Sequence, residues 1–256
     1  MNKILIANGS VAYFDIMGYE SINTRNEIKE VAKIILDHLD GIPASIRDIR
    51  KKYFLSIGLD EHADRFAKSI SSILLSDSVL LTEKEPMKGW GAREKLLNWL
   101  FFLHACYMLM NKMLDGNLLL RGAIGYGRYF RKGNCFAGKP IIDSIRLAES
   151  LDLAGCVFVP NAWDEVEKVI AAEGLGLVAD FIRSITFKYE VPLKSCASER
   201  SFKSHVMIGF GTKDNLEQKV RQAFTSYNRE ITEKVRPKID NTVLMIQSFL
   251  KCKCTS

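Results

Sequence analysis

Apolar residues in the first third of the chain change from a strand-like to a helix-like pattern. Residues 11–17 form an apolar, β-prone run without regular alternation, which predicts a strand buried on both faces. An amphipathic helix is expected after Gly18, because apolar residues recur at positions 28, 31, 34, 35 and 39. The glycine and proline of residues 41–54 then indicate a connection.

The middle of the chain predicts a hairpin, a long helix and a glycine-rich strand. Residues 70–83 are two apolar runs that meet at the polar residues 76–78, which is typical of a β-hairpin. Residues 91–114 have the length and periodicity of a helix that ends near Gly116. Residues 121–130 return to a strand whose glycines would allow another backbone segment to approach closely.

The second half of the chain predicts alternating helices and strands. The helices are expected at residues 142–152, 161–174, about 215–235 and 238–252, and the strands at 155–160, 181–191 and 205–211. Asn161 would cap the second of these helices and Gly174 would end it. Because the order mixes βα units with hairpins, we expect a single α+β domain over residues 1–256, with a mixed or antiparallel sheet flanked by helices.

The composition is that of an ordinary folded protein. Among 256 residues, 47% are hydrophobic and 26% are charged, which suits one large domain and argues against a disordered chain. The formal net charge is +6, with lysines and arginines interleaved with acids. This pattern does not indicate a nucleic-acid-binding surface, whereas a small polyanionic ligand would suit the charge balance.

The cysteines and the most apolar window bear on whether the protein is cytoplasmic and whether it spans a membrane. The six cysteines include no CxxC pair and no signal peptide is recognisable, so we expect reduced thiols and a cytoplasmic protein. The apolar window at residues 96–110 contains Asn98 and His104 and is shorter than the roughly 18 residues of a membrane span. A buried or interfacial helix is therefore expected there, and no membrane span.

Two aspartates stand where apolar strands end. Asp15 ends the first predicted strand and Asp77 lies in the hairpin turn, so neighbouring strands could bring both carboxylates to one edge of the sheet. Close carboxylates repel unless a cation lies between them. A hard divalent ion that uses one or two carboxylates together with substrate phosphates would remove the conflict and would indicate phosphoryl chemistry with two metals.

Simpler interpretations remain for each of these residues. Asp15 could cap a helix, and Asp77 is of a type that favours turns. Arg121 could orient an aspartate or reach a phosphate. Met17, Gly18 and Tyr19 would form a strand-to-helix turn whose backbone N–H groups favour phosphate oxygens.

Three motifs, taken in order, resemble those of the class III nucleotidyl cyclases. FDIMGYESI resembles the first metal motif, SILLSDSVLL the second, and RGAIGYG with FAGKPIIDSIRLAESLD the third block. The SDS turn, the RGAIGYG strand and the segment KIDNTVLMIQSFL look most like the bacterial pyrimidine cyclases of the Pycsar anti-phage system, which make cyclic UMP or cyclic CMP. The resemblance covers residues 10–155 through its motifs and, more faintly, the C-terminal helix, and it implies a sheet with a ferredoxin-like core.

The resemblance also implies roles for individual residues. Asp15 and Asp77 would hold two Mg²⁺ or Mn²⁺ ions per site, with the carbonyl of Ile16 as a further ligand. Residues 17–19 would contact the triphosphate. Arg146 would neutralise charge on the transferred phosphoryl group. Because this family shares its sites across a head-to-tail homodimer, Arg146 would act on the partner's substrate.

Some positions depart from the family pattern. Ile142 stands where the cyclases have a transition-state asparagine. Ile73 replaces the lysine that adenylate cyclases use for the base, and Cys135 replaces its partner aspartate, as in guanylate cyclases but without their glutamate. A pyrimidine substrate, UTP before CTP, is therefore implied, with Cys135 at the base or else a small buried residue. A purine cyclase with altered base contacts and a catalytically degenerate cyclase-like domain are the alternatives.

Overall fold

One eight-stranded sheet organises the described part of the chain. The computed structural model describes residues 5–40, 69–84, 91–173, 176–195, 199–209 and 215–254, together with Asp48. The strands are β1 (Leu5–Ile16), β2 (Ile70–Leu75), β3 (Ser78–Lys84), β4 (Leu120–Lys132), β5 (Cys135–Ala137), β6 (Gly155–Phe158), β7 (Thr186–Pro192) and β8 (Ser201–Met207). Their order is β2-β3-β1-β4-β6-β8-β7, with β5 paired to β4.

The sheet is mixed, as the sequence predicts. β1 pairs antiparallel with β3 on one side and with β4 on the other, while β4 and β6 are parallel. β1 is buried on both faces: Val11 faces one layer, and Ala12 and Phe14 face the other. The predicted hairpin at residues 70–83 is confirmed as β2 and β3.

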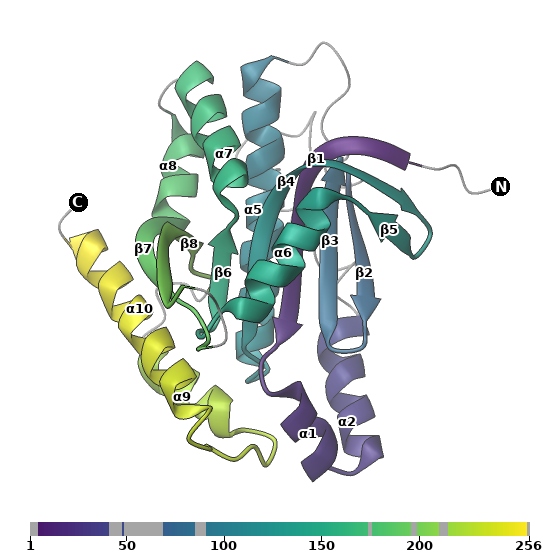
Figure 1. The fold of residues 1–256 in the computed structure, drawn as a ribbon, viewed down its shortest axis with the longest axis vertical. Helices are drawn as coiled ribbons and strands as arrows, with labels where there is room; N and C mark the ends of the chain where they lie inside the picture. Colours follow the sequence, from purple (N-terminus) through teal and green to yellow (C-terminus); the bar gives the residue numbers. More distant parts are fainter. Residues whose placement is uncertain are drawn as a thin grey trace.

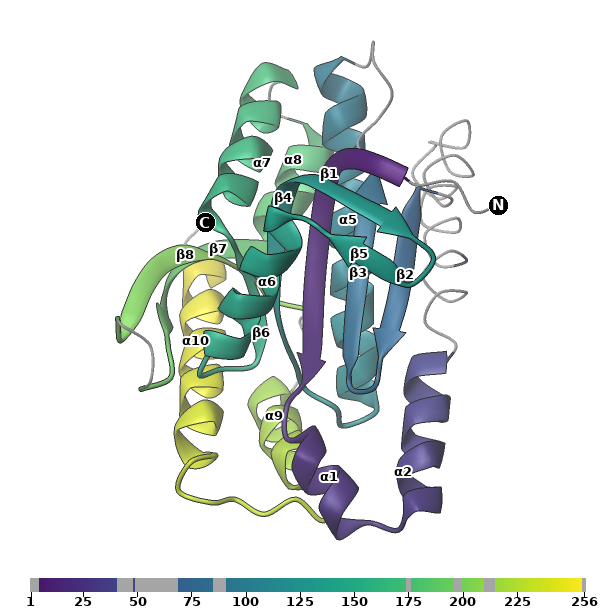
Figure 2. The same cartoon turned by 45° about the vertical axis from the view of Figure 1, so that its right-hand side comes forward.

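Helices cover both faces of this sheet. They are α1 (Tyr19–Arg25), α2 (Ile28–Ile35) with a π-helical turn (Leu36–Asp40), α5 (Ala92–Asp115), α6 (Lys139–Ser150), α7 (Pro160–Glu173), α8 (Leu177–Ile185), α9 (Leu216–Thr225) and α10 (Arg236–Cys254). α6 crosses one face and α5 runs behind the other, while α9 and α10 approach the lower end of β1 (Figures 1 and 2). The large core lies on the α5 face, and a smaller one lies under α6.

The long helix is buried within the protein. Asn98 and His104 of α5 are both buried, which confirms the expectation of a buried helix. Among the described residues, no helix has the length and apolar character needed to cross a membrane.

Three predictions differ from the structure. The strand expected at residues 181–191 is confirmed only from Thr186 onward, as β7. Residues 181–185 belong to α8, where Ala179, Ile182 and Ile185 are buried at helical spacing. The helix expected at 215–235 ends at Thr225, and two left-handed residues, Tyr227 (φ 58°) and Asn228 (φ 56°), follow it.

The predicted cap of α7 is the third error. Asn161 lies inside α7, whose first residue is Pro160, and its side chain donates to the carbonyl of Tyr126 at 2.8 Å. Proline suits the first helical position because its φ is fixed and no N–H is needed there. The predicted connection at 41–54, apart from Asp48, lies outside the described residues, as do Gly174 and the end of the strand predicted at 205–211.

The expected close approach at the glycine-rich strand occurs at Gly125. A Cβ atom there would lie 2.7 Å from the carbonyl oxygen of Pro140 and 2.6 Å from the hydroxyl of Ser144, both on α6. Gly125→Ala is therefore expected to lower the free energy of unfolding by about 2 kcal/mol, because α6 must shift to relieve the overlap. Urea unfolding measures this change.

Gly176→Ala is the matched control for this substitution. Within the described part of the chain, no heavy atom other than those of its own neighbours in sequence lies within 4 Å of a Cβ at Gly176, and its backbone is extended (φ −165°). We expect the control to change stability by less than about 0.5 kcal/mol. Equal effects of the two substitutions would contradict the proposed overlap at Gly125.

Candidate functional site

The strand register brings the two aspartates to the same end of the sheet. Asp15, next to last in β1, stands opposite Ser78 of β3 and opposite Arg121 of β4. Residues directly opposite each other in an antiparallel pair project to the same face. Asp77 immediately precedes β3, and its carbonyl accepts a hydrogen bond from the N–H of Ile16 at 3.0 Å.

Asp15 is a buried carboxylate between a cation and a second carboxylate. It is 8% exposed, and the Nε of Arg121 donates to its Oδ2 at 2.7 Å, with Nη2 making a second contact. Burial raises the pKa of Asp15, the Arg121 guanidinium lowers it, and the carboxylate of Asp77 raises it again. The two acids are thus close enough to interact electrostatically, as the sequence suggested.

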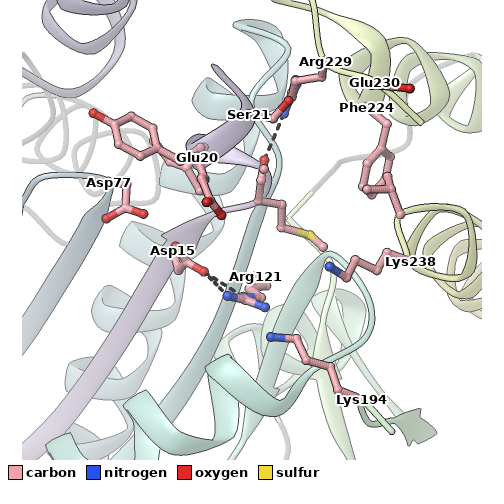
Figure 3. Close-up of a pocket in the computed structure, with 15 residues that line it drawn as sticks. Asp15, Glu20, Ser21, Asp77, Arg121, Lys194, Phe224, Arg229, Glu230 and Lys238 are labelled. Carbon is pink, nitrogen blue, oxygen red and sulfur yellow. Dashed lines mark hydrogen bonds and ion pairs between the residues drawn. The ribbon is translucent and has the colours of Figure 1, made fainter. Parts of the chain in front are cut away.

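A cavity of about 330 Å³ opens beside these carboxylates. Asp15, Asp77 and Arg121 line one wall, and Met17, Gly18 and Tyr19 line the next. Lys194, Lys238 and Arg229 come from the C-terminal third of the chain, and Figure 3 shows the ends of both lysine side chains near Arg121. The lining holds four acidic side chains, those of Asp15, Glu20, Asp77 and Glu230, and four basic ones, a mixture that suits a polyanion bound together with a divalent cation.

The turn after β1 is held in one conformation. The N–H of Met17 donates to the carbonyl of Leu119 at 2.9 Å. Gly18 follows with φ 73° and ψ 20°, a left-handed conformation that glycine adopts most readily, and α1 begins at Tyr19. The predicted strand-to-helix turn therefore exists, and it lies on the wall of the cavity.

Other predicted site residues lie elsewhere in the chain. Arg146 is exposed on α6, and neither it nor Cys135 lines the cavity. Cys135 is exposed in the short strand β5, so its interpretation as a small buried residue is wrong. Ile142, at the asparagine position, is 47% exposed on α6. Within a single chain, these three residues therefore do not lie at the cavity of Asp15 and Asp77.

Three lining cations were not predicted from the sequence. Lys194 follows β7, Arg229 lies between α9 and α10, and Lys238 is in the first turn of α10. The three stand more than 70 residues beyond Arg121; Lys194 and Arg229 belong to no recognised motif, and Lys238 opens the segment KIDNTVLMIQSFL, to which no site role was assigned. The positive net charge was the one signal that agreed with their presence.

Comparison with solved structures identifies the fold. No family model matches the chain, and neither does any curated protein. The adenylyl cyclase CyaB from P. aeruginosa aligns at a TM-score of 0.50 and 12% identity over 80% of this chain and 96% of that one. A bacterial light-regulated adenylyl cyclase aligns at 0.52 and 9% identity over 88% of this chain, which spans 59% of that protein's length.

The chain has the class III nucleotidyl cyclase fold. This confirms the fold expected from the three motifs. At such low identity the likeness establishes the cyclase fold alone, so the chemistry of the site is argued from its own residues.

Asp15 and Asp77 suit a divalent ion whose remaining coordination positions are filled by the phosphates of a bound ligand. Among the described residues, no group of three or more His, Cys, Asp or Glu side chains could hold a metal. Asp15 and Asp77 nevertheless supply the two hard oxygen donors that a loosely held Mg²⁺ or Mn²⁺ needs when phosphates provide the rest. Ile16, the third metal ligand expected from the cyclase motif, also lines the cavity.

The electrostatics of this cyclase-fold site predict opposite shifts for two variants. Without divalent ions, Arg121→Gln should raise the pKa of Asp15, because the cation that stabilises its charge is removed. Asp77→Asn should lower it, because the repelling carboxylate is gone. Carbon-13 NMR titration of the Asp15 carboxyl measures both, and a shift in the same direction for both variants would contradict the arrangement.

The same pKa has a consequence for stability. Because the pKa of Asp15 is raised on folding, the folded chain binds this proton more tightly than the unfolded chain. The stabilisation from Asp15 is therefore present at low pH and is lost as the pH rises through the folded-state pKa.

Proposed function

We propose that this protein is a nucleotidyl cyclase that converts a pyrimidine nucleoside triphosphate, UTP before CTP, into the 3′,5′-cyclic nucleotide and pyrophosphate. The observation that carries the proposal is the cavity where Asp15 and Asp77 meet beside the turn of Met17 and Gly18. Its other wall carries cations suited to phosphates, and the chain around it has the cyclase fold.

In the proposed reaction, the ribose 3′ oxygen attacks the α-phosphorus and its proton passes to water, while the bond from that phosphorus to the β-phosphate oxygen breaks and pyrophosphate leaves. Two divalent ions held by Asp15 and Asp77, with the carbonyl of Ile16, would acidify the hydroxyl and neutralise the leaving pyrophosphate. Arg121 opposes the effect of burial and so favours the charged form of Asp15 that binds a cation. Residues 17–19 would hold the triphosphate.

Arg146 would act across a dimer interface. It is exposed on α6 and outside the cavity of its own chain, which suits a residue that completes the site of a partner in a head-to-tail homodimer. There its guanidinium would stabilise the charge that develops on the transferred phosphoryl group. Ile142 is exposed on the same helix and offers no hydrogen bond, so ribose orientation must come from other residues.

The residues at the two positions that read the base in purine cyclases, Ile73 and Cys135, support a pyrimidine substrate. Ile73, at the position of the adenine-reading lysine, is a β2 residue that is 4% exposed and belongs to the small core. It presents no polar group to a purine. Cys135 is exposed and would contact the base from the partner subunit. The likeness of the motifs to the Pycsar cyclases further suggests a second messenger for anti-phage defence.

The proposal is tested by incubating the dimeric protein with each of the four nucleoside triphosphates and Mn²⁺. Mass spectrometry identifies the products, and we expect cyclic UMP to predominate. A cyclic purine nucleotide as the main product would retain the cyclase and overturn the pyrimidine preference. No cyclic product from any of the four would overturn the proposed activity and favour the degenerate, ligand-binding domain.

A further inference from the structure

Residues 226–230, the first half of the loop between α9 and α10, reach the cavity through one buried arginine. Arg229 lines the cavity and is 8% exposed. Its guanidinium donates to four backbone carbonyls, those of Met17 (3.0 Å), Asn117 (2.8 Å), Ser226 (2.9 Å) and Ala223. Among the residues that the structure describes, no carboxylate pairs with it. Arg229 is therefore a cation surrounded by dipoles instead of a counter-charge.

A buried guanidinium in such surroundings is costly in the absence of an anion. Burial lowers the pKa of Arg229 to about 10. The carbonyl dipoles offset part of this cost, as does the ring of Tyr227, whose centroid lies 5.8 Å from the guanidinium carbon. An anion in the neighbouring cavity would provide the missing counter-charge.

Arg229 also holds the turn that the proposed triphosphate would contact. Its Nη1 donates to the carbonyl of Met17, the dashed line drawn from Arg229 in Figure 3. Its Cδ would lie 3.3 Å from a Cβ placed on Gly18. Its Nη2 bonds the carbonyl of Asn117, three residues before β4 begins and four before Arg121. One side chain thus joins the turn that follows Asp15 to the segment that leads into β4, where Arg121 lies.

The rest of the loop is fastened to the far end of α1. The Nδ2 of Asn26 donates to the carbonyl of Tyr227 and the Nδ2 of Asn228 donates to Asn26, both at 2.9 Å, and Glu230 pairs with Arg25. Tyr227 and Asn228 are left-handed, with φ of 58° and 56°, a conformation that is unfavourable for a tyrosine. The unfavourable backbone conformation of Tyr227 is compatible with a loop that serves to position the side chain of Arg229.

We propose that Arg229 is a positioning residue for polyphosphate binding. It fixes the turn of Met17 and Gly18 against the cavity and adds a positive charge that the ligand's phosphates neutralise. The inference deepens the proposed function, on which it depends for the identity of the ligand as a nucleoside triphosphate.

Inorganic triphosphate with Mg²⁺ is the probe that tests this inference. Isothermal titration calorimetry compares its affinity for the wild type, Arg229→Met, Arg229→Lys and Arg221→Met. We expect Arg229→Met to bind about tenfold more weakly, with a larger loss at low salt than at high salt. Arg229→Lys keeps the charge but cannot bridge the four carbonyls, so its affinity should fall by an intermediate factor.

Arg221→Met is the matched control, because Arg221 is an exposed α9 residue that forms a surface ion pair with Asp240 at 3.9 Å. Its triphosphate affinity should equal that of the wild type. Wild-type affinity in both Arg229 variants, even with lowered melting temperatures, would reduce Arg229 to a structural residue and overturn the inference. So would a wild type that does not bind triphosphate.

Failure of the proposed function gives a different result. The wild-type protein could make no cyclic nucleotide while Arg229→Lys still lowers the affinity for triphosphate. That result would contradict the cyclase proposal and retain this inference. In an active enzyme, Arg229→Lys should raise KM for the nucleotide more than it lowers kcat, because Arg229 acts on binding through the turn.

Discussion

Replacing Asp15 by asparagine should lower cyclase activity by at least about a thousandfold, equivalent to about 4 kcal/mol of transition-state stabilisation. The amide keeps the shape of the side chain but removes the negative charge that would hold a divalent ion beside Asp77. Arg121 would then face a neutral group on the cavity wall. Cyclic nucleotide production at saturating substrate and Mn²⁺ measures the loss.

The fold should survive this substitution. Burial already disfavours the charged form of Asp15, so a neutral amide removes that cost while it loses the pairing with Arg121. A cooperative melting transition should therefore persist. Asp180→Asn is the control, since Asp180 is exposed on α8 and does not line the cavity; it should retain full activity. Activity of Asp15→Asn within tenfold of the wild type would contradict the two-carboxylate site.

Local patterns predicted the elements around the site better than those at the end of the chain. The hairpin, α5 and β4 have strong signals, because each is a long periodic or apolar segment bounded by polar residues or glycine. The segment at 181–185 is apolar and β-branched enough to resemble a strand, yet its burial follows a helical stripe in α8. The residue propensities of this segment allow either a strand or a helix, and packing against α5 selects the helix.

The residues on the two sides of the cavity also differed in how well the sequence predicted them. Asp15, Asp77 and the turn of Met17 and Gly18 could be predicted because each lies within a motif next to a strand end. Lys238 and Arg229 could not, since their place at the cavity depends on where α9 and α10 pack. No spacing in the sequence encodes that docking, and Arg229 in particular lies in a segment for which a continuous helix was expected.

Mixing two inactive variants should restore activity if the sites are shared between subunits. Arg146→Met alone should lose about a thousandfold, the scale expected for an arginine that stabilises a phosphoryl transition state. In a mixed head-to-tail dimer of Asp15→Asn and Arg146→Met, one site carries both changes and the other carries neither. Because about half of randomly paired dimers are mixed, about a quarter of wild-type activity should return.

The control for this experiment pairs Asp15→Asn with Asp77→Asn. These two carboxylates line the cavity of the same chain, so every site of a mixed dimer keeps one defect and the mixture should remain inactive. Co-expression with two affinity tags isolates the mixed dimers and doubles the expected return to about half of the wild-type level. An inactive Asp15→Asn and Arg146→Met heterodimer would mean that Arg146 does not serve the partner's substrate, and its exposed position on α6 would then be that of a solvated surface residue.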